Sequence, residues 1–153
     1  MPITSVTRSL DADNLIDGAR LQLLANSYIT TTLATATNPK RIANEIVEEG
    51  TLPPYIVLAL ASTVYESSYS EAAINTLLDV SCYTEGASTA IVRALIAACV
   101  TALVDTAWTA AGLTIWSVSL DESGTGIRNV TAVTNGVITR GRQATLRVRA
   151  AKT

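Results

Sequence analysis

Residues 113–150 decide the fold of this chain: they read LTIWSVSLD (113–121), a polar stretch (122–140) and GRQATLRVRA (141–150). Both flanking segments alternate apolar and polar side chains, which is the period of a strand with one buried face. The polar stretch contains Asn135-Gly136, a strong signal for a two-residue turn between strands. We expect two strands joined by a hairpin or loop over 122–140 that projects beyond the domain, as in a subunit built to stack against its own copies.

Three segments ahead of these strands show helical signals. Apolar residues recur at helical spacing after Asp11, which predicts a long N-terminal helix that follows an irregular arm over residues 1–10. Asn38-Pro39 is typical of a helix start and predicts a short helix over 39–49. Residues 88–108 are rich in alanine and predict an amphipathic helix packed closely on a sheet. The two apolar stripes consist of Ala12, Ile16, Ala19 and Leu23, and of Val92, Ile96, Cys99 and Leu103.

Two further apolar segments predict strands. Residues 55–61 form an unbroken apolar run and residues 74–83 alternate, so the two segments are expected to pair as antiparallel neighbours. Strand pairs that alternate with helices predict a single α+β domain over residues 1–153. Its expected centre is an antiparallel sheet of about four strands, flanked by the long N-terminal helix and the central alanine-rich helix, with the projecting hairpin arm.

The tryptophans and cysteines are expected in the core. Trp108 and Trp116 are interpreted as core anchors rather than as platforms for stacking bases. The strand face that holds Trp116 is expected to include Val118 and Leu120. Cys82 and Cys99 lie in apolar surroundings, where cysteine behaves as a small buried hydrophobe. The sequence leaves open whether the two thiols are close.

The chain carries few charges. Charged residues make up 16% of the sequence and hydrophobic residues 48%, whereas about 25% charged residues are usual. Such a surface is expected to be covered by a membrane or by neighbouring subunits. Arg93 and Asp105 interrupt the most apolar run, and the stretch between them is shorter than the roughly 20 residues that span a bilayer. We therefore expect contact with other subunits and no membrane, and the N-terminus lacks the pattern of a secretory signal.

Charge is divided unevenly along the chain. Residues 1–85 hold four basic and ten acidic side chains (net −6) and residues 86–153 hold seven basic and three acidic (net +4), which sum to −2. One interpretation is a solvated sheet face. A second is complementarity, in which a basic patch on one copy faces an acidic patch on the next and fixes its orientation. A third is a small nucleic-acid-binding module that uses the final strand. The predicted interface consists of Arg140, Arg142, Arg147 and Arg149 on the basic side and Glu45, Glu48 and Glu49 on the acidic side.

No catalytic motif occurs in the sequence. The chain has no histidine, which removes Ser-His-Asp and Cys-His catalysis and the commonest metal ligand. Its cysteines form no C-x-x-C pair, and neither a Walker-type loop nor a G-x-G-x-x-G loop is present. We therefore expect no enzyme activity, no catalytic residue, no cofactor and no metal.

The order of the segments resembles a known family. After an N-terminal helix come LPPYIVLALAS (52–62), LLDVSCYTEG (77–86) and the alanine-rich STAIVRALIAACVTAL (88–103). GLTIWSVSLDES (112–123), a variable loop and RGRQATLRVRA (140–150) complete the pattern. Over residues 10–150 the arrangement resembles the tail terminator proteins of long-tailed bacteriophages and the related neck and tail-completion subunits.

The resemblance implies a structural virion protein of the tail or neck that assembles in the host cytoplasm. It implies a homo-oligomeric ring, typically a hexamer, at the head-proximal end of the tail tube. Such a ring stops tube growth and contacts the tail tube protein and the head–tail connector, and DNA passes through its lumen without sequence-specific binding. A tail tube or other neck subunit is the alternative of the same class. The family has no catalytic residues to carry over to this chain.

Overall fold

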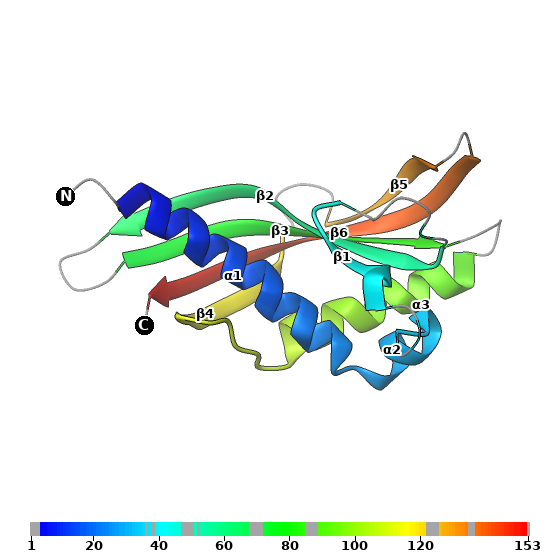
Figure 1. The fold of residues 1–153 in the computed structure, drawn as a ribbon, viewed down its shortest axis with the longest axis horizontal. Helices are drawn as coiled ribbons and strands as arrows, with labels where there is room; N and C mark the ends of the chain where they lie inside the picture. The colour runs from blue at the N-terminus through cyan, green and yellow to red at the C-terminus, as the bar shows by residue number, and fades with distance from the viewer. Residues whose placement is uncertain are drawn as a thin grey trace.

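A twisted sheet with helices packed on one of its faces makes up the fold (Figure 1). The structure is a computed structural model, which describes residues 4–35, 37, 39–46, 51, 53–67, 72–84, 89–121, 126–134 and 137–152. The helical elements are α1 (Thr4–Leu24), α2 (Ser27–Leu33), the 3-10 turn η1 (Pro39–Arg41), α3 (Thr89–Val100) and the π-helical turn η2 (Thr101–Asp105). The strands are β1 (Ile42–Asn44), β2 (Tyr55–Ser67), β3 (Ala72–Thr84), β4 (Leu113–Leu120), β5 (Ile127–Thr134) and β6 (Val137–Lys152). Helices on a multi-stranded sheet confirm the α+β class.

Strand β6 organises the sheet. It pairs antiparallel with β3 from Ala73↔Ala151 to Thr84↔Arg140. On its other side, β4 pairs with the C-terminal part of β6 and β5 pairs with the N-terminal part, so β4 and β5 follow each other along one edge. Beyond β3 lie β2, which is antiparallel to it as expected, and then β1, which is parallel to β2. The order across the sheet is therefore β1-β2-β3-β6-β4, with β5 also on β6.

The six-stranded mixed sheet differs from the expected four antiparallel strands, and β1 accounts for the mixed pairing. Strand β1 falls within residues 39–49, where the sequence predicted a short helix. That prediction is wrong for the described residues of the segment. Only one 3-10 turn forms before Ile42 enters the core at 1% exposure. Arg20 Nε then donates to the Ile42 carbonyl oxygen at 2.8 Å. Burial and tertiary hydrogen bonding thus outweigh the local helix signal, while residues 47–49 lie outside the described residues.

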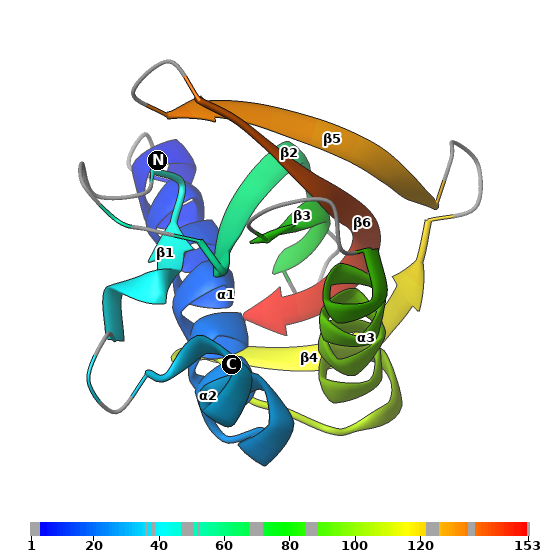
Figure 2. The ribbon, with the colours of Figure 1, turned by 90° about the vertical axis from the view of Figure 1, so that its right-hand side faces the viewer.

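The polar stretch over 122–140 contributes the other additional strand. β5 and the first part of β6 form an antiparallel hairpin from Ile127↔Ala144 to Thr134↔Val137. The predicted turn at Asn135-Gly136 lies between these two strands in the sequence. Residues 135–136 and 122–125 are outside the described residues. The hairpin continues past Thr84↔Arg140, the last pair that β6 makes with β3. Figure 2 shows it on the opposite side of the molecule from α2.

Alternate residues of β3 and β6 face the helices and form the core. Nine side chains in the middle of this face are at most 3% exposed, and they meet the apolar stripes of α1 and α3. Gly18 lets α1 approach the chain before β4, because a Cβ there would lie 2.5 Å from the Thr109 carbonyl oxygen. The sheet residues of this face are Ile74, Thr76, Leu78, Val80, Cys82, Ala144, Leu146, Val148 and Ala150.

Helix α1 begins earlier than expected. It starts at Thr4, so the irregular arm predicted over residues 1–10 is wrong for 4–10. No proline or glycine occurs between Thr4 and Asp17 to end a helix in that direction, and the backbone continues helically through the segment.

The central helix ends earlier than expected. Regular α3 stops at Val100 and one π-helical turn carries the chain to Asp105, short of the predicted end at residue 108. Trp108 then turns back, and its Nε1 donates to the Leu103 carbonyl oxygen at 2.9 Å. Its 8% exposure confirms Trp108 as a core anchor.

Trp116 is not in the core, although its strand was expected to bury it. The register shifts between Ile115↔Ala150 and Ser117↔Arg149, so Trp116 is the extra residue of a β-bulge. Because of the bulge, Ile115 points toward the helices, on the same face of β4 as Val118 and Leu120. Trp116 is released to the surface and is 48% exposed.

Candidate assembly interface

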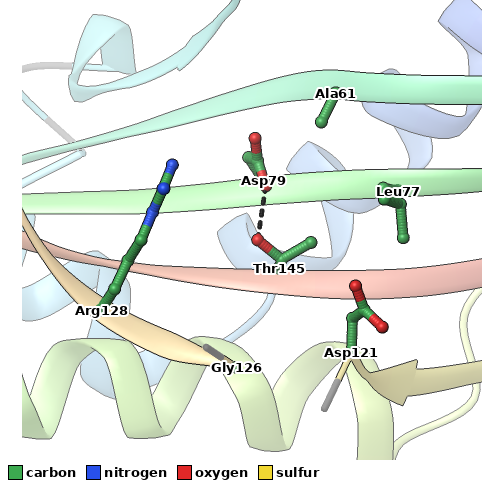
Figure 3. A pocket seen from close by; sticks show the side chains of 7 residues that line it. All are labelled: Ala61, Leu77, Asp79, Asp121, Gly126, Arg128 and Thr145. Carbon is green, nitrogen blue, oxygen red and sulfur yellow. Dashed lines mark hydrogen bonds between the residues drawn. The ribbon is translucent and has the colours of Figure 1, made fainter. Parts of the chain in front are cut away.

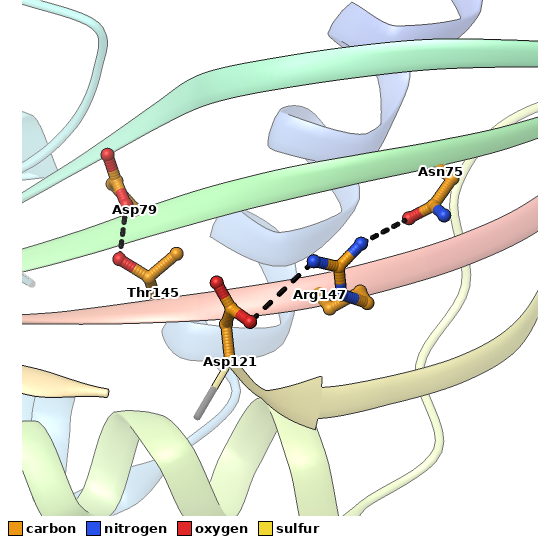
Figure 4. A network of polar contacts seen from close by, with 5 residues as sticks. All are labelled: Asn75, Asp79, Asp121, Thr145 and Arg147. Carbon is orange, nitrogen blue, oxygen red and sulfur yellow. Dashed lines mark hydrogen bonds and ion pairs between the residues drawn. The ribbon is translucent and has the colours of Figure 1, made fainter. Parts of the chain in front are cut away.

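The sheet face turned away from the helices carries a ladder of polar side chains (Figure 4). Thr145 Oγ1 on β6 donates to Asp79 Oδ1 on β3 at 2.7 Å. One register step along, Gln143 Nε2 donates to Ser81 Oγ at 3.0 Å, and Arg128 Nε on β5 donates to Gln143 Oε1 at 2.7 Å. Cross-strand contacts of this kind stabilise a sheet by fractions of a kcal/mol each. The ladder therefore fixes the arrangement of a hydrophilic surface more than it stabilises the fold.

Arg147 belongs to this ladder and is half-exposed. Its Nη1 donates to Asn75 Oδ1 at 3.3 Å, and its Nη2 lies 3.6 Å from Asp121 Oδ1. Of this ion pair the Arg147 side chain is 42% exposed and the Asp121 side chain 13%. The guanidinium is thus held in one position by groups from β3 and from the end of β4, and one side of it still faces solvent.

An open hollow of about 240 Å³ lies over this face, from Ala61 on β2 across the ladder to Asp121 and Gly126 beside β4 and β5 (Figure 3). Asp79 and Asp121 contribute carboxylates to its lining, and Arg128 contributes a guanidinium. Hydroxyl, carboxylate and guanidinium groups suit hydrogen bonds and ion pairs with a partner surface. Among the described residues, no cluster of three or more His, Cys, Asp or Glu could hold a metal ion. The lining consists of Ala61, Leu77, Asp79, Asp121, Gly126, Arg128 and Thr145.

Arg149 and Trp116 form a second feature at the β4 edge. The Arg149 guanidinium carbon lies 6.0 Å from the centroid of the Trp116 ring, at the limit of a cation–π contact. Both side chains are exposed. Tryptophan and arginine are the residue types most enriched among the side chains that dominate binding energy.

The predicted basic patch is divided between the two faces of β6. Arg140 and Arg142 are in register with Thr84 and Cys82, on the face that carries the helices. Arg147 and Arg149 alternate with them on the open face, because successive side chains of a strand point to opposite faces. The structure therefore does not bring the four arginines together. The same division leaves no continuous basic strip on one face of β6 for a nucleic acid.

The predicted acidic patch is described only at Glu45. This side chain is exposed at the end of β1, and its backbone has φ 67°. Its amide donates to the Leu58 carbonyl oxygen at 2.7 Å, which holds the turn against β2. Glu48 and Glu49 lie outside the described residues. Glu45 and Arg149 are thus near opposite edges of the sheet, at β1 and beside β4.

Sequence reasoning missed several side chains of this surface. Asp79 falls at a polar position of the predicted strand 74–83, which indicates no partner, and Arg128 falls within the polar stretch 122–140. The alternation of β3 against β6 was a sufficient signal for the Asp79–Thr145 contact, once the pairing register is known. The exposure of Trp116 had no such signal, because a bulge leaves no clear mark in an alternating strand.

Comparisons with known proteins agree with this architecture. A chain of a solved structure titled "Virion of native gene transfer agent (GTA) particle" has the same fold, with a TM-score of 0.66 at 19% identity. The match covers 92% of this chain and 97% of that chain. The comparison with curated proteins found no match. No helix among the described residues has the length and apolar character to cross a bilayer. The model of the family "Tail completion protein gp17" matches residues 10–151. This chain therefore belongs to the tail completion protein gp17 family and is a structural protein of the virion tail or neck.

Proposed function

We propose that this protein forms a closed ring, of six copies, at the head-proximal end of a phage tail. The ring ends growth of the tail tube and joins the tail to the head connector, and DNA passes through its lumen without sequence-specific binding. Its contacts are the tail tube protein on one side and connector proteins on the other. The observation that carries the ring is that the sheet has two unlike open edges.

The first edge is β2 with the short strand β1. β1 pairs with β2 only from Ile42↔Ile56 to Asn44↔Leu58. From Ala59 to Ser67, no described strand lies on the outer side of β2. The second edge is formed by β4 and β5, whose outer sides also have no strand among the described residues. An open strand edge is a template for contact with another chain.

Unlike edges are what a ring requires. A closed ring is held by head-to-tail contacts, in which two different patches of the subunit meet. Glu45 marks the β1 edge with a negative charge, and Arg149 marks the β4 edge with a positive one. Complementary charges at such positions fix the register and the direction of assembly. We retain Arg140, Arg142 and Arg147 on the basic side and Glu48 and Glu49 on the acidic side as proposed interface residues.

The β5–β6 hairpin supports the contact with neighbouring virion proteins. Beyond Thr84↔Arg140, no strand among the described residues lies on the β3 side of its β6 half. The β5–β6 ribbon lies at one end of the molecule (Figure 1). We propose that the ribbon contacts the tail tube or the connector after the ring has formed.

Native mass spectrometry and particle imaging test the ring, on the purified protein and on the protein added to isolated tail tubes. We expect rings of six copies. Reversing both charges, Arg147→Glu with Arg149→Glu, is expected to leave the monomer folded by circular dichroism and to block ring formation. The single variant Arg149→Glu leaves the Arg147–Asp121 ion pair within each copy intact. A loss of rings in this variant is therefore attributable to the contact between copies. Normal rings from the double variant would refute the interface, and a chain that stays monomeric at every concentration, with and without tails, would refute the ring.

A further inference from the structure

Ile46 is an exposed apolar side chain beside the β1 edge. It is 81% exposed, the largest exposed fraction among the described large hydrophobic residues. Its backbone amide donates to the Asn44 carbonyl oxygen at 2.8 Å, directly after the Glu45 amide that is bound to β2. Asn44 Nδ2 in turn donates to Asp17 Oδ1 on α1 at 2.8 Å. Hydrogen bonds to both the sheet and a helix therefore position the backbone of this turn, which directs Ile46 outward from the β1 edge.

A hollow of about 390 Å³, lined by both apolar and polar side chains, lies at the opposite edge, between β4 and the chain that follows α3. Two backbone irregularities shape it, the π-helical turn η2 on one wall and the bulge at Trp116 on the other. Irregularities of both kinds concentrate at functional sites, where they redirect side chains. The hollow is lined by Leu103, Val104, Asp105, Thr106, Ala107, Trp108, Ile115, Trp116, Ser117 and Val118.

The charges beside these two features match in sign. Glu45 directly precedes Ile46, and Arg149 lies over Trp116 at the hollow. The hollow also contains one carboxylate, Asp105, on the wall formed by η2. An incoming Glu45 is therefore attracted to the β4 wall and repelled from the η2 wall, which selects one orientation of the approaching copy.

We propose that Ile46 of one copy inserts into the hollow beside Trp116 of the next copy, with Glu45 paired to Arg149, and that this contact repeats around the ring. The inference rests on the proposed function, since it specifies which surfaces meet in the head-to-tail assembly. The occupant is a second copy because Ile46 with Glu45 and the hollow with Arg149 lie at opposite edges of the same sheet, with apolar side chains and opposite charges available on the two sides. Each copy can then give one contact and receive one, as ring closure requires.

Photo-crosslinking tests the contact directly. A photoreactive benzoylphenylalanine at position 46, in the assembled protein, is expected to label residues 103–118 of a neighbouring copy, read by mass spectrometry of the digested dimer. The same probe at position 91 is the control, because Ile91 is also an exposed large hydrophobic residue, 47% exposed, but lies on α3. Labelling of residues elsewhere from position 46, or equal labelling of 103–118 from position 91, would overturn the proposal.

Substitutions test its energetics. We expect Ile46→Ser and Trp116→Ala each to raise the protein concentration at half-assembly by about tenfold or more, and Ile91→Ser to leave it unchanged. Glu45→Arg and Arg149→Glu are each expected to weaken assembly, and the two together to restore it, which neither a folding defect nor general loss of charge would produce. If the wild type assembles and these variants assemble equally well, the contact is wrong and the ring stands. If the wild type never assembles, the proposed function itself fails.

Discussion

The two faces of β6 show how one strand serves two purposes. On the face toward the helices, Ala144, Leu146 and Val148 are fully buried. On the other face, Thr145 and Arg147 alternate with them and remain partly exposed in a polar ladder. Burial of apolar area drives folding, at roughly 25 cal/mol per Å², whereas partly exposed ion pairs contribute little. The helix-covered face therefore holds the fold together, whereas the open face contributes little to stability.

The largest expected effect separates the two faces at adjacent residues. Leu146→Ala removes a fully buried side chain and is expected to lower the free energy of unfolding by about 2–5 kcal/mol. Arg147→Ala, its neighbour on the open face, is expected to lower it by less than about 1 kcal/mol, since the ion pair with Asp121 is partly exposed. Urea denaturation measures both. Equal losses would remove the distinction between the faces.

A smaller effect is expected where the open face is closely packed. A Cβ on Gly141 would collide with the Cys82 carbonyl oxygen and lie 2.8 Å from Tyr83 Cδ1. Gly141→Ala is therefore expected to cost about 1–3 kcal/mol of unfolding free energy through displacement of the strands. Arg140→Ala, at the exposed neighbouring position, serves as the control. A wild-type denaturation midpoint for Gly141→Ala would show that β3 and β6 can separate there without cost.

The smallest effect is a pH dependence that belongs to the helix-covered face. Burial raises the pKa of the Cys82 thiol well above its ordinary value of 9.0, and the neighbouring Cys99 thiol, with sulfur atoms 3.8 Å apart, acts in the same direction. The unfolded chain therefore loses this proton first as pH rises. The neutral Cys82 thiol makes its full contribution to the free energy of unfolding below about pH 9. Above that pH the free energy of unfolding falls, by up to about 1.4 kcal/mol per pH unit.

Denaturation of the wild type and of Cys82→Ala between pH 7 and 10.5 measures this slope. The variant is expected to be less stable at pH 7, because a buried side chain is truncated, and to lose less stability as pH rises. Parallel curves for the two proteins would show that the thiol does not contribute.

The sequence predicted the parts of the fold that depend on regular periods. Alternation in residues 74–83 and 141–150 identified β3, β6 and their buried faces, and Trp108 was assigned to the core correctly. The antiparallel pairing of β2 with β3 also followed from the pattern. Regular alternation is informative because a one-residue slip would move every apolar side chain into solvent.

Errors arose where one residue departs from the period or where tertiary contacts decide. The bulge at Trp116 changes the phase of β4, so that a strictly alternating reading buries the wrong residue. Ile42 forms a strand because β2 and Arg20 satisfy its backbone, which no local propensity reports. The predicted interface stays a prediction, and the odd separation of Arg140 and Arg149 along β6 places them on opposite faces of the strand.

The continuity of β6 has a mechanical consequence for a structural protein of the virion tail or neck. One uninterrupted strand runs from the hairpin, past the ladder, to the edge beside Trp116. A pull on the hairpin along the strand axis acts in shear, since the hydrogen bonds to antiparallel neighbours are perpendicular to the strands. The bonds to β3 must then stretch together instead of opening one after another. Tension along β6 would therefore be resisted by all of these backbone hydrogen bonds at once.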